Sequence, residues 1–129
     1  MGNLETVQRF YSGAAAGDMD EVRSIMATRV MWQQTPGWPD ASTFGTPDEV
    51  IEGVFAKLGS EWDGFKGVPE EFIDAGDKII VLGTYSGTSK ATGRSFEAPF
   101  AHVFTVQDGA VTALRQFADT ALVHAAWKD

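Results

Sequence analysis

Cysteine is absent from the 129 residues of the chain. A protein without thiols forms no disulfide, no iron–sulfur cluster and no zinc site built on thiolates, and it has no thiolate nucleophile. Redox chemistry therefore does not fix its compartment. No pair of carboxylates has a spacing typical of metal ligands, so neither a metal ion nor another cofactor is expected.

Long apolar runs and positive charge are also scarce. The N-terminal sequence lacks the basic start and apolar core of a signal peptide, and no apolar run approaches the roughly 20 residues of a membrane span. Lys and Arg number 10 against 18 Asp and Glu, which gives a net charge of −8. Nucleic acids and anionic membranes are bound by Lys/Arg patches, so neither is expected as a partner. We expect a cytoplasmic protein.

Hydrophobic residues make up 43% of the chain and aromatic residues 12%. This content excludes disorder, and the length fits one domain, residues 1–129, with room for one core or one pocket. No linker, repeat or low-complexity tract divides the chain.

A long hairpin predicted between Phe96 and Thr120 dominates the second half of the chain. Asp108-Gly109 lies between two alternating runs, and Asp-Gly is a strong hairpin signal because both residues accept a positive φ at low cost. The first run, Phe96 to Val106, carries one of the two histidines. Both of its faces are largely apolar, which is typical of an association surface.

The first half of the chain alternates helix and strand signals. Apolar residues at helical spacing predict a helix that has Asn3 as its N-cap and ends at Gly17. A second helix is predicted to begin at the N-cap Asp18. Thr46-Pro47-Asp48-Glu49 opens a third helix, which is predicted to stop at Gly59. Strands are expected over 29–35, 67–73 and 78–86, and a short helix at the C-terminus.

This order predicts an α+β fold with helices on one face of a bent antiparallel sheet. The loop 36–45 carries Trp38 and Phe44, two large apolar side chains that are costly to leave in water. We therefore expect this loop to fold back as a lid or rim over an apolar space.

Three stretches carry a family resemblance: VQRFYSGAAAGDMDEVRSIM, VMWQQTP and APFAHVFTVQDGAVTALRQFADT. In their order and spacing, they resemble the SnoaL-like branch of the nuclear transport factor 2-like superfamily, to which ketosteroid isomerases and polyketide cyclases belong. The resemblance implies a cone-shaped, curved antiparallel sheet around an apolar pocket whose mouth is closed by helices. It also implies a homodimer joined through the outer face of the sheet.

Ketosteroid isomerases use a carboxylate base together with a tyrosine and a protonated aspartic acid that stabilise an enolate oxygen. The resemblance matches the tyrosine position to Phe10, which is followed by Tyr11. It matches the position of the base to Gln34 and that of the aspartic acid to Ala101. Phenylalanine, glutamine and alanine cannot fill these roles. Steroid isomerisation by that mechanism is therefore not expected.

The resemblance and the strand patterns together predict which side chains line the pocket. Amides such as Gln34 and Gln116 donate and accept hydrogen bonds and stay neutral at all pH values, so they suit orientation of a ligand or a satisfied core hydrogen bond. The aromatic residues suit either pocket wall or plain core. The predicted ligand-binding residues are Trp32, Gln34, Trp38, Phe55, Tyr85, Ala101, Leu114 and Gln116.

His102 and Asp119 are the candidate catalytic pair. Histidine is the natural general base near neutral pH, and Asp119 could orient it. The alternatives are structural: if Ala101 faces the pocket, His102 faces outward toward a dimer partner, and Asp119 is the N-cap of the C-terminal helix.

Two functions follow from these patterns. The first is a protein that binds a small apolar molecule in an internal pocket without chemistry. The second is an acid–base isomerase, cyclase or hydrolase acting on a small cyclic or polyketide-like substrate. Whether His102 and Asp119 converge on one cavity distinguishes them.

Overall fold

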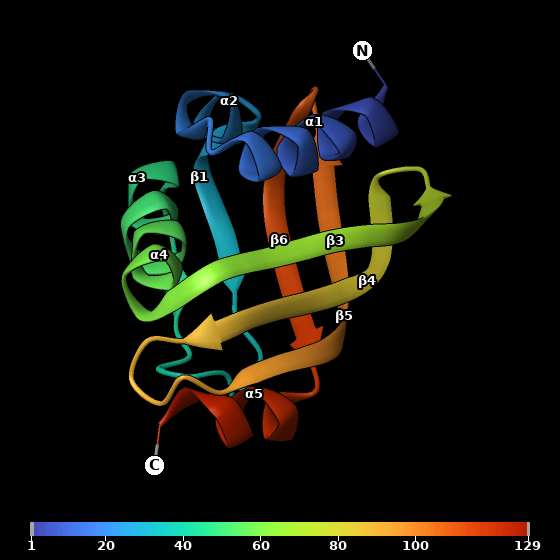
Figure 1. Cartoon of the computed structure of the whole chain (residues 1–129). Coiled ribbons are helices and arrows are strands. Elements are labelled where there is room, and N and C mark those ends of the chain that lie inside the picture. The colour runs from blue at the N-terminus through green and yellow to red at the C-terminus, as the bar shows by residue number, and fades with distance from the viewer. Residues whose placement is uncertain (1, 129) are drawn as a thin grey trace.

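The computed structural model of the protein describes residues 2–128. These residues form five α-helices, a π-helical segment and six strands (Figure 1). The helical segments are α1 (Asn3–Ala16), α2 (Met19–Ser24), α3 (Pro47–Val50), η1 (Ile51–Ala56), α4 (Lys57–Glu61) and α5 (Thr120–Trp127). The strands are β1 (Met26–Gln33), β2 (Thr43–Phe44), β3 (Trp62–Ala75), β4 (Lys78–Ser89), β5 (Ser95–Gln107) and β6 (Ala110–Ala118).

The strands form one sheet in the order β2-β1-β6-β5-β4-β3. β1 pairs with β6 in parallel, and the other neighbours are antiparallel. The sheet curls strongly, so that β3 and the end of β4 cross in front of β1 and β6 in Figure 1. The prediction of an α+β fold built on a curved sheet is confirmed. The sheet is mixed and not antiparallel throughout, because β1 is parallel to β6.

The hairpin of β5 and β6 closes as predicted. Val106 is opposite Val111 and Gln107 is opposite Ala110, which leaves Asp108 and Gly109 as the two-residue loop. Their φ angles are 51° and 78°, the pair of positive values that a type I′ turn requires.

The N-caps predicted at Asp18 and Thr46 are confirmed, whereas the N-cap of α1 is Gly2 and not Asn3. Asp18 accepts a hydrogen bond from the backbone N–H of Glu21, and Thr46 accepts one from that of Glu49. Gly17 ends α1 in the left-handed region, at φ 69°. Each of these interactions satisfies groups that a helix end leaves unpaired.

Other boundaries differ from the sequence-based prediction. β3 begins at Trp62, whereas the sequence pattern predicts a strand only from Gly67. Its pairing with β4 is interrupted by irregularities, and Gly64 has a φ of 63°. These features bend the edge strand and hide its strand pattern. The third helix also runs past Gly59 to Glu61.

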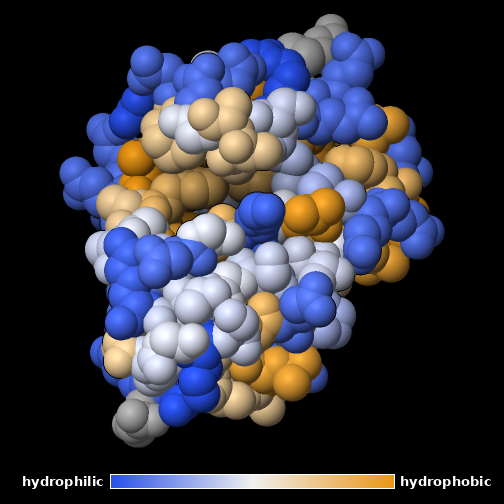
Figure 2. Space-filling view, in the orientation of Figure 1, coloured by the Kyte–Doolittle hydropathy of each residue, from blue (hydrophilic) through white to orange (hydrophobic). Residues whose placement is uncertain are grey.

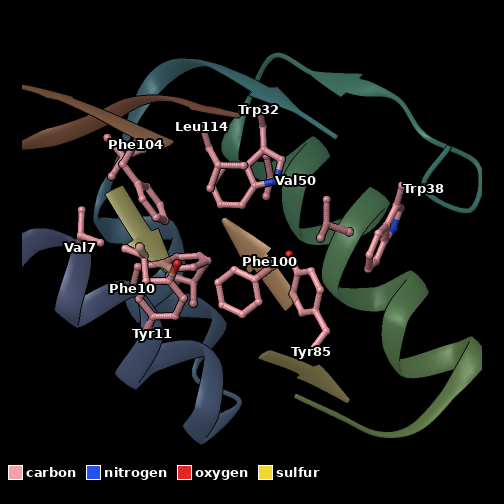
Figure 3. Packing of buried hydrophobic residues seen from close by; sticks show 14 of the residues in the cluster. Val7, Phe10, Tyr11, Trp32, Trp38, Val50, Tyr85, Phe100, Phe104 and Leu114 are labelled. Atoms are coloured by element: carbon pink, nitrogen blue, oxygen red, sulfur yellow. The ribbon is translucent and has the colours of Figure 1, made fainter. Parts of the chain in front are cut away.

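The core lies between α1 and the concave face of the sheet. Figure 3 shows Phe10 and Tyr11 of α1 close to Phe104 of β5, with Trp32 of β1 above them. The ring centroids of Phe10 and Phe104 are 5.4 Å apart, and those of Phe10 and Trp32 are 5.5 Å apart. Among residues 2–128, no helix is long and apolar enough to cross a membrane.

Candidate functional site

A cavity of about 900 Å³ opens into the concave side of the sheet. Its mouth lies between the end of α1, the segment η1–α4 and the edge strand β3, represented by Ala14, Ile51, Leu58 and Val68. Figure 2 shows apolar surface inside the hollow beneath α1. Drug-sized ligands occupy cavities of roughly this volume, about 300–1,000 Å³.

Most of the predicted pocket residues line this cavity. Trp38, in the loop after β1, is only 6% exposed and packs on Tyr85 with ring centroids 5.2 Å apart. The loop therefore folds back over the apolar space, as expected from its composition. The predicted residues found in the lining are Trp32, Gln34, Trp38, Phe55, Tyr85, Leu114 and Gln116.

Ala101 is the exception, and its predicted place in the pocket is wrong. β5 buries Phe100, His102 and Phe104 on the concave face, while Ala101 and Val103 are half-buried on the outer face. Because successive side chains of a strand point to opposite faces, an error of one position reverses the strand. The resemblance placed Ala101 one position away from the inward residue.

His102 therefore points into the cavity, and the expectation that it faces a dimer partner is wrong. The side chain is 6% exposed and is one of the residues lining the cavity. Its ring stacks on Phe100 with a centroid distance of 4.2 Å. Its ring also lies edge-on to Phe104, with a centroid distance of 6.0 Å.

Both ring nitrogens of His102 bond to tyrosine hydroxyls. The Tyr11 hydroxyl is 2.5 Å from Nδ1, and the Tyr85 hydroxyl contacts Nε2. Gln116 Nε2 donates to the Tyr85 hydroxyl at 3.0 Å, and the backbone N–H of Thr35 donates to Gln116 Oε1 at 3.2 Å. The network joins α1, β4, β5 and β6 across the interior.

Asp119 takes no part in this network. Its side chain is exposed and accepts a hydrogen bond from the backbone N–H of Leu122, as the N-cap of α5. The structure thus does not bring His102 and Asp119 together, and Asp119 plays the alternative role of a cap. The other histidine, His124, bonds to the carbonyl of Gly37 outside the cavity.

Burial keeps the network neutral. Desolvation lowers the pKa of His102 from 6.5 to about 3, because a charged imidazolium is unfavourable away from water. Desolvation also raises the pKa of Tyr11 and of Tyr85 well above the ordinary value. Near neutral pH, these groups can donate and accept hydrogen bonds but are poor proton acceptors.

The neutral state fixes the number of available donors. A neutral imidazole has one N–H and one bare nitrogen, so one tyrosine hydroxyl accepts from His102 and the other donates to it. The accepting hydroxyl keeps its own O–H, for which residues 2–128 offer no further acceptor. Because Tyr11 and Tyr85 both line the cavity, one phenolic O–H is available to a molecule inside it.

Sequence reasoning missed Tyr11 as a site residue. Its apolar spacing with Val7 and Ala14 indicated the buried face of a helix, and a tyrosine on such a face needs a partner for its hydroxyl. That signal identifies the residue but not its partner. Among residues 2–128, no group of three or more His, Asp or Glu side chains lies together as a metal site would require.

The fold and the cavity define a domain of the nuclear transport factor 2-like class. The family profile described as SnoaL-like domain matches residues 7–114, and the chain belongs to this SnoaL-like family. No curated protein matches the chain.

Solved structures agree with this assignment. An NTF2-like protein of Burkholderia thailandensis is 37% identical, with 97% of this chain and 96% of that chain covered and a TM-score of 0.94. An NTF2-like protein of unknown function from Burkholderia pseudomallei is 28% identical, with 98% of both chains covered and a TM-score of 0.89. TerC, co-crystallised with polyporic acid, is 26% identical, with 96% of both chains covered and a TM-score of 0.85.

Proposed function

We propose that the protein binds a small, largely apolar organic molecule in the cavity between α1, η1–α4 and β3. The observation that carries this proposal is the cavity of about 900 Å³ with the Tyr11–His102–Tyr85 network in its wall. Pockets for small molecules combine an apolar wall with a few placed polar groups. The complex of TerC with polyporic acid supports a small organic ligand for this fold.

The second candidate is an enzyme that acts on a small cyclic or polyketide-like substrate as an isomerase, cyclase or hydrolase. The observation in its favour is a hydrogen-bonded histidine with two tyrosines inside an apolar cavity. Such a network would stabilise a developing oxyanion by donation, because the low pKa of His102 makes it a weak base. We do not propose steroid isomerisation through a carboxylate base, because position 34 carries the amide of Gln34, which does not ionise.

The proposal includes a homodimer joined through the outer face of the sheet, in a cytoplasmic protein without nucleic-acid or membrane partners. Support for the dimer comes from Met31, Leu82 and Phe117, which are 60%, 37% and 41% exposed. These residues belong to β1, β4 and β6. Large apolar side chains of this kind on one sheet face favour association.

A cavity-blocking substitution tests the binding proposal. Ala14 lines the mouth from α1, and a bulky side chain there should fill the entrance. We expect Ala14→Phe to weaken binding of an apolar fluorescent probe at least tenfold, because the phenylalanine ring and the probe would compete for the same space in the cavity. Probe fluorescence and thermal unfolding are measured for the same samples.

Ala16→Phe is the matched control. Ala16 is exposed at the end of the same helix and does not line the cavity, so its substitution should leave probe binding as in the parent protein. Equal probe affinity in both variants, with both folded, would place the probe elsewhere and refute the proposed cavity.

A further inference from the structure

The amide of Gln116 has a fixed orientation inside the protein. The backbone N–H of Thr35 donates to Gln116 Oε1 at 3.2 Å, and the amide nitrogen donates to the Tyr85 hydroxyl at 3.0 Å. A reversed amide would point its own N–H groups at the N–H of Thr35, and this contact is unfavourable because both groups are donors. The backbone at Thr35 therefore makes Gln116 a donor to Tyr85.

Thr35 belongs to the loop that covers the cavity with Trp38. The backbone N–H of Trp38 donates to the Thr35 carbonyl at 3.0 Å. Gln34 and Ser42 close the base of the loop, because the Gln34 N–H donates to the Ser42 carbonyl at 3.1 Å and the Ser42 N–H donates to Gln34 Oε1 at 3.1 Å. The position of the Thr35 N–H thus depends on this loop, residues 34–42, which we call the Trp38 loop.

The single proton of the neutral His102 ring can occupy either ring nitrogen. With the proton on Nδ1, His102 donates to the Tyr11 hydroxyl and accepts from the Tyr85 hydroxyl at Nε2. With the proton on Nε2, His102 donates to Tyr85 and accepts from Tyr11. Together with the bond from Gln116, each arrangement makes three hydrogen bonds and leaves one phenolic O–H without an acceptor among residues 2–128. The two arrangements differ only in the order of their donors.

Gln116 favours the arrangement with the proton on Nδ1. Its amide nitrogen already donates to the Tyr85 oxygen, so in that arrangement Tyr85 accepts once and donates once. All bonds then run in one direction, from Thr35 through Gln116, Tyr85 and His102 to Tyr11, and hydrogen bonds in such a chain polarise and strengthen one another. With the proton on Nε2, two N–H groups converge on one hydroxyl oxygen, and this reinforcement is lost at Tyr85.

We infer that Gln116 is a positioning residue that holds His102 as the Nδ1–H tautomer, and that the Trp38 loop controls this tautomer through the backbone N–H of Thr35. The inference goes beyond the proposed function, because it holds for the protein without a ligand. A shift of the Trp38 loop would release the Gln116 amide and lower the preference for Nδ1–H. The change of tautomer removes one proton from Nδ1 and adds one at Nε2, both exchanged with water, so the net charge stays the same.

Long-range proton–nitrogen correlation spectra of isotopically labelled protein test this inference without any ligand. The chemical shifts of the two ring nitrogens distinguish the tautomers, and the variant His102→Gln assigns the His102 signals by their loss. At pH 7.5, we expect the Nδ1–H tautomer as the major form in the parent protein.

Two substitutions break the chain of hydrogen bonds at different points. Gln116→Leu removes the amide donor to Tyr85. Thr35→Pro removes the backbone N–H at a position that Pro36 already restricts to extended backbone, and it leaves every side chain of the network in place. Each should lower the ratio of the Nδ1–H to the Nε2–H tautomer severalfold. The matched controls are Thr35→Ala, which keeps the N–H, and Leu114→Ala, which alters the cavity wall on the same strand; both should keep the parent ratio.

The outcomes separate the two parts of the inference. The Nε2–H tautomer as the major form in the parent protein, or an equal ratio in Gln116→Leu and Leu114→Ala, overturns the role of Gln116. A folded Thr35→Pro with the same ratio as Thr35→Ala overturns the coupling to the Trp38 loop. If Thr35→Pro does not fold, Gln34→Leu, which removes one bond closing the loop, takes its place in the same comparison. Loss of probe binding bears on the proposed function alone, because these spectra are recorded without a ligand.

Discussion

Acidification should destabilise this protein through a single buried histidine. The pKa of His102 is lowered from 6.5 to about 3 by desolvation, so the folded state stays unprotonated at pH values where the unfolded chain binds a proton. A depressed folded-state pKa gives stability that is present above the unfolded pKa and is lost as pH falls toward the folded pKa. The window therefore runs from about pH 6.5 down to about pH 3.

The magnitude follows from the width of that window. Each pH unit inside it costs about 1.4 kcal/mol of unfolding free energy, so the full effect is roughly 5 kcal/mol, a large share of the 5–15 kcal/mol typical of a domain. Between pH 7 and pH 5, the free energy of unfolding should fall by about 2 kcal/mol, because the histidine of the unfolded chain is only partly protonated near pH 7.

The assay compares the parent protein with His102→Gln by urea unfolding at pH 7, 6 and 5. Glutamine can donate and accept as imidazole does but does not titrate, and the carboxylates and His124 are common to both proteins. The parent should lose about 2 kcal/mol more than His102→Gln over this range. Equal pH dependence of the two unfolding free energies would show that His102 is not the neutral, buried group described here.

Two further predictions concern the ends of the molecule and its outer face. Asp119→Asn should keep the free energy of unfolding within about 0.5 kcal/mol of the parent value, and Asp119→Ala should lower it by about 1 kcal/mol, since Asn caps α5 as well as Asp does and Ala does not. If urea unfolding shows as large a loss for Asp119→Asn as for Asp119→Ala, Asp119 is not the cap. The protein should sediment as a dimer at micromolar concentration, and Phe117→Glu on the exposed face of β6 should shift it to monomer by placing a charge in an apolar contact. Sedimentation of the parent protein as a monomer would refute the proposed dimer interface.

Local chemistry made much of the fold predictable from the sequence. The Asp108-Gly109 turn and the caps at Asp18 and Thr46 each depend on residues within a few positions of one another. The apolar patterns of the strands gave the hairpin and the α+β class in the same way. Where the signal was interrupted, as by Gly64 in β3, the boundary was misplaced.

The centre of the candidate site was not predictable in this way. The hydrogen bond between Tyr11 and His102 joins residues 91 positions apart, and no local pattern encodes such a contact. Alternation in β5 put Phe100 and His102 on one face but could not say which face was inside. The resemblance supplied that choice through Ala101 and was wrong by one residue, with the consequence that His102 was assigned to the outer face.

A crystal structure of the complex with the apolar fluorescent probe tests the central claim, a ligand-binding cavity, most directly. The account predicts that the probe lies inside the cavity lined by α1, η1–α4 and β3. It should contact Trp32 and Tyr85, which line the cavity. A cavity left without the probe under saturating conditions would contradict it.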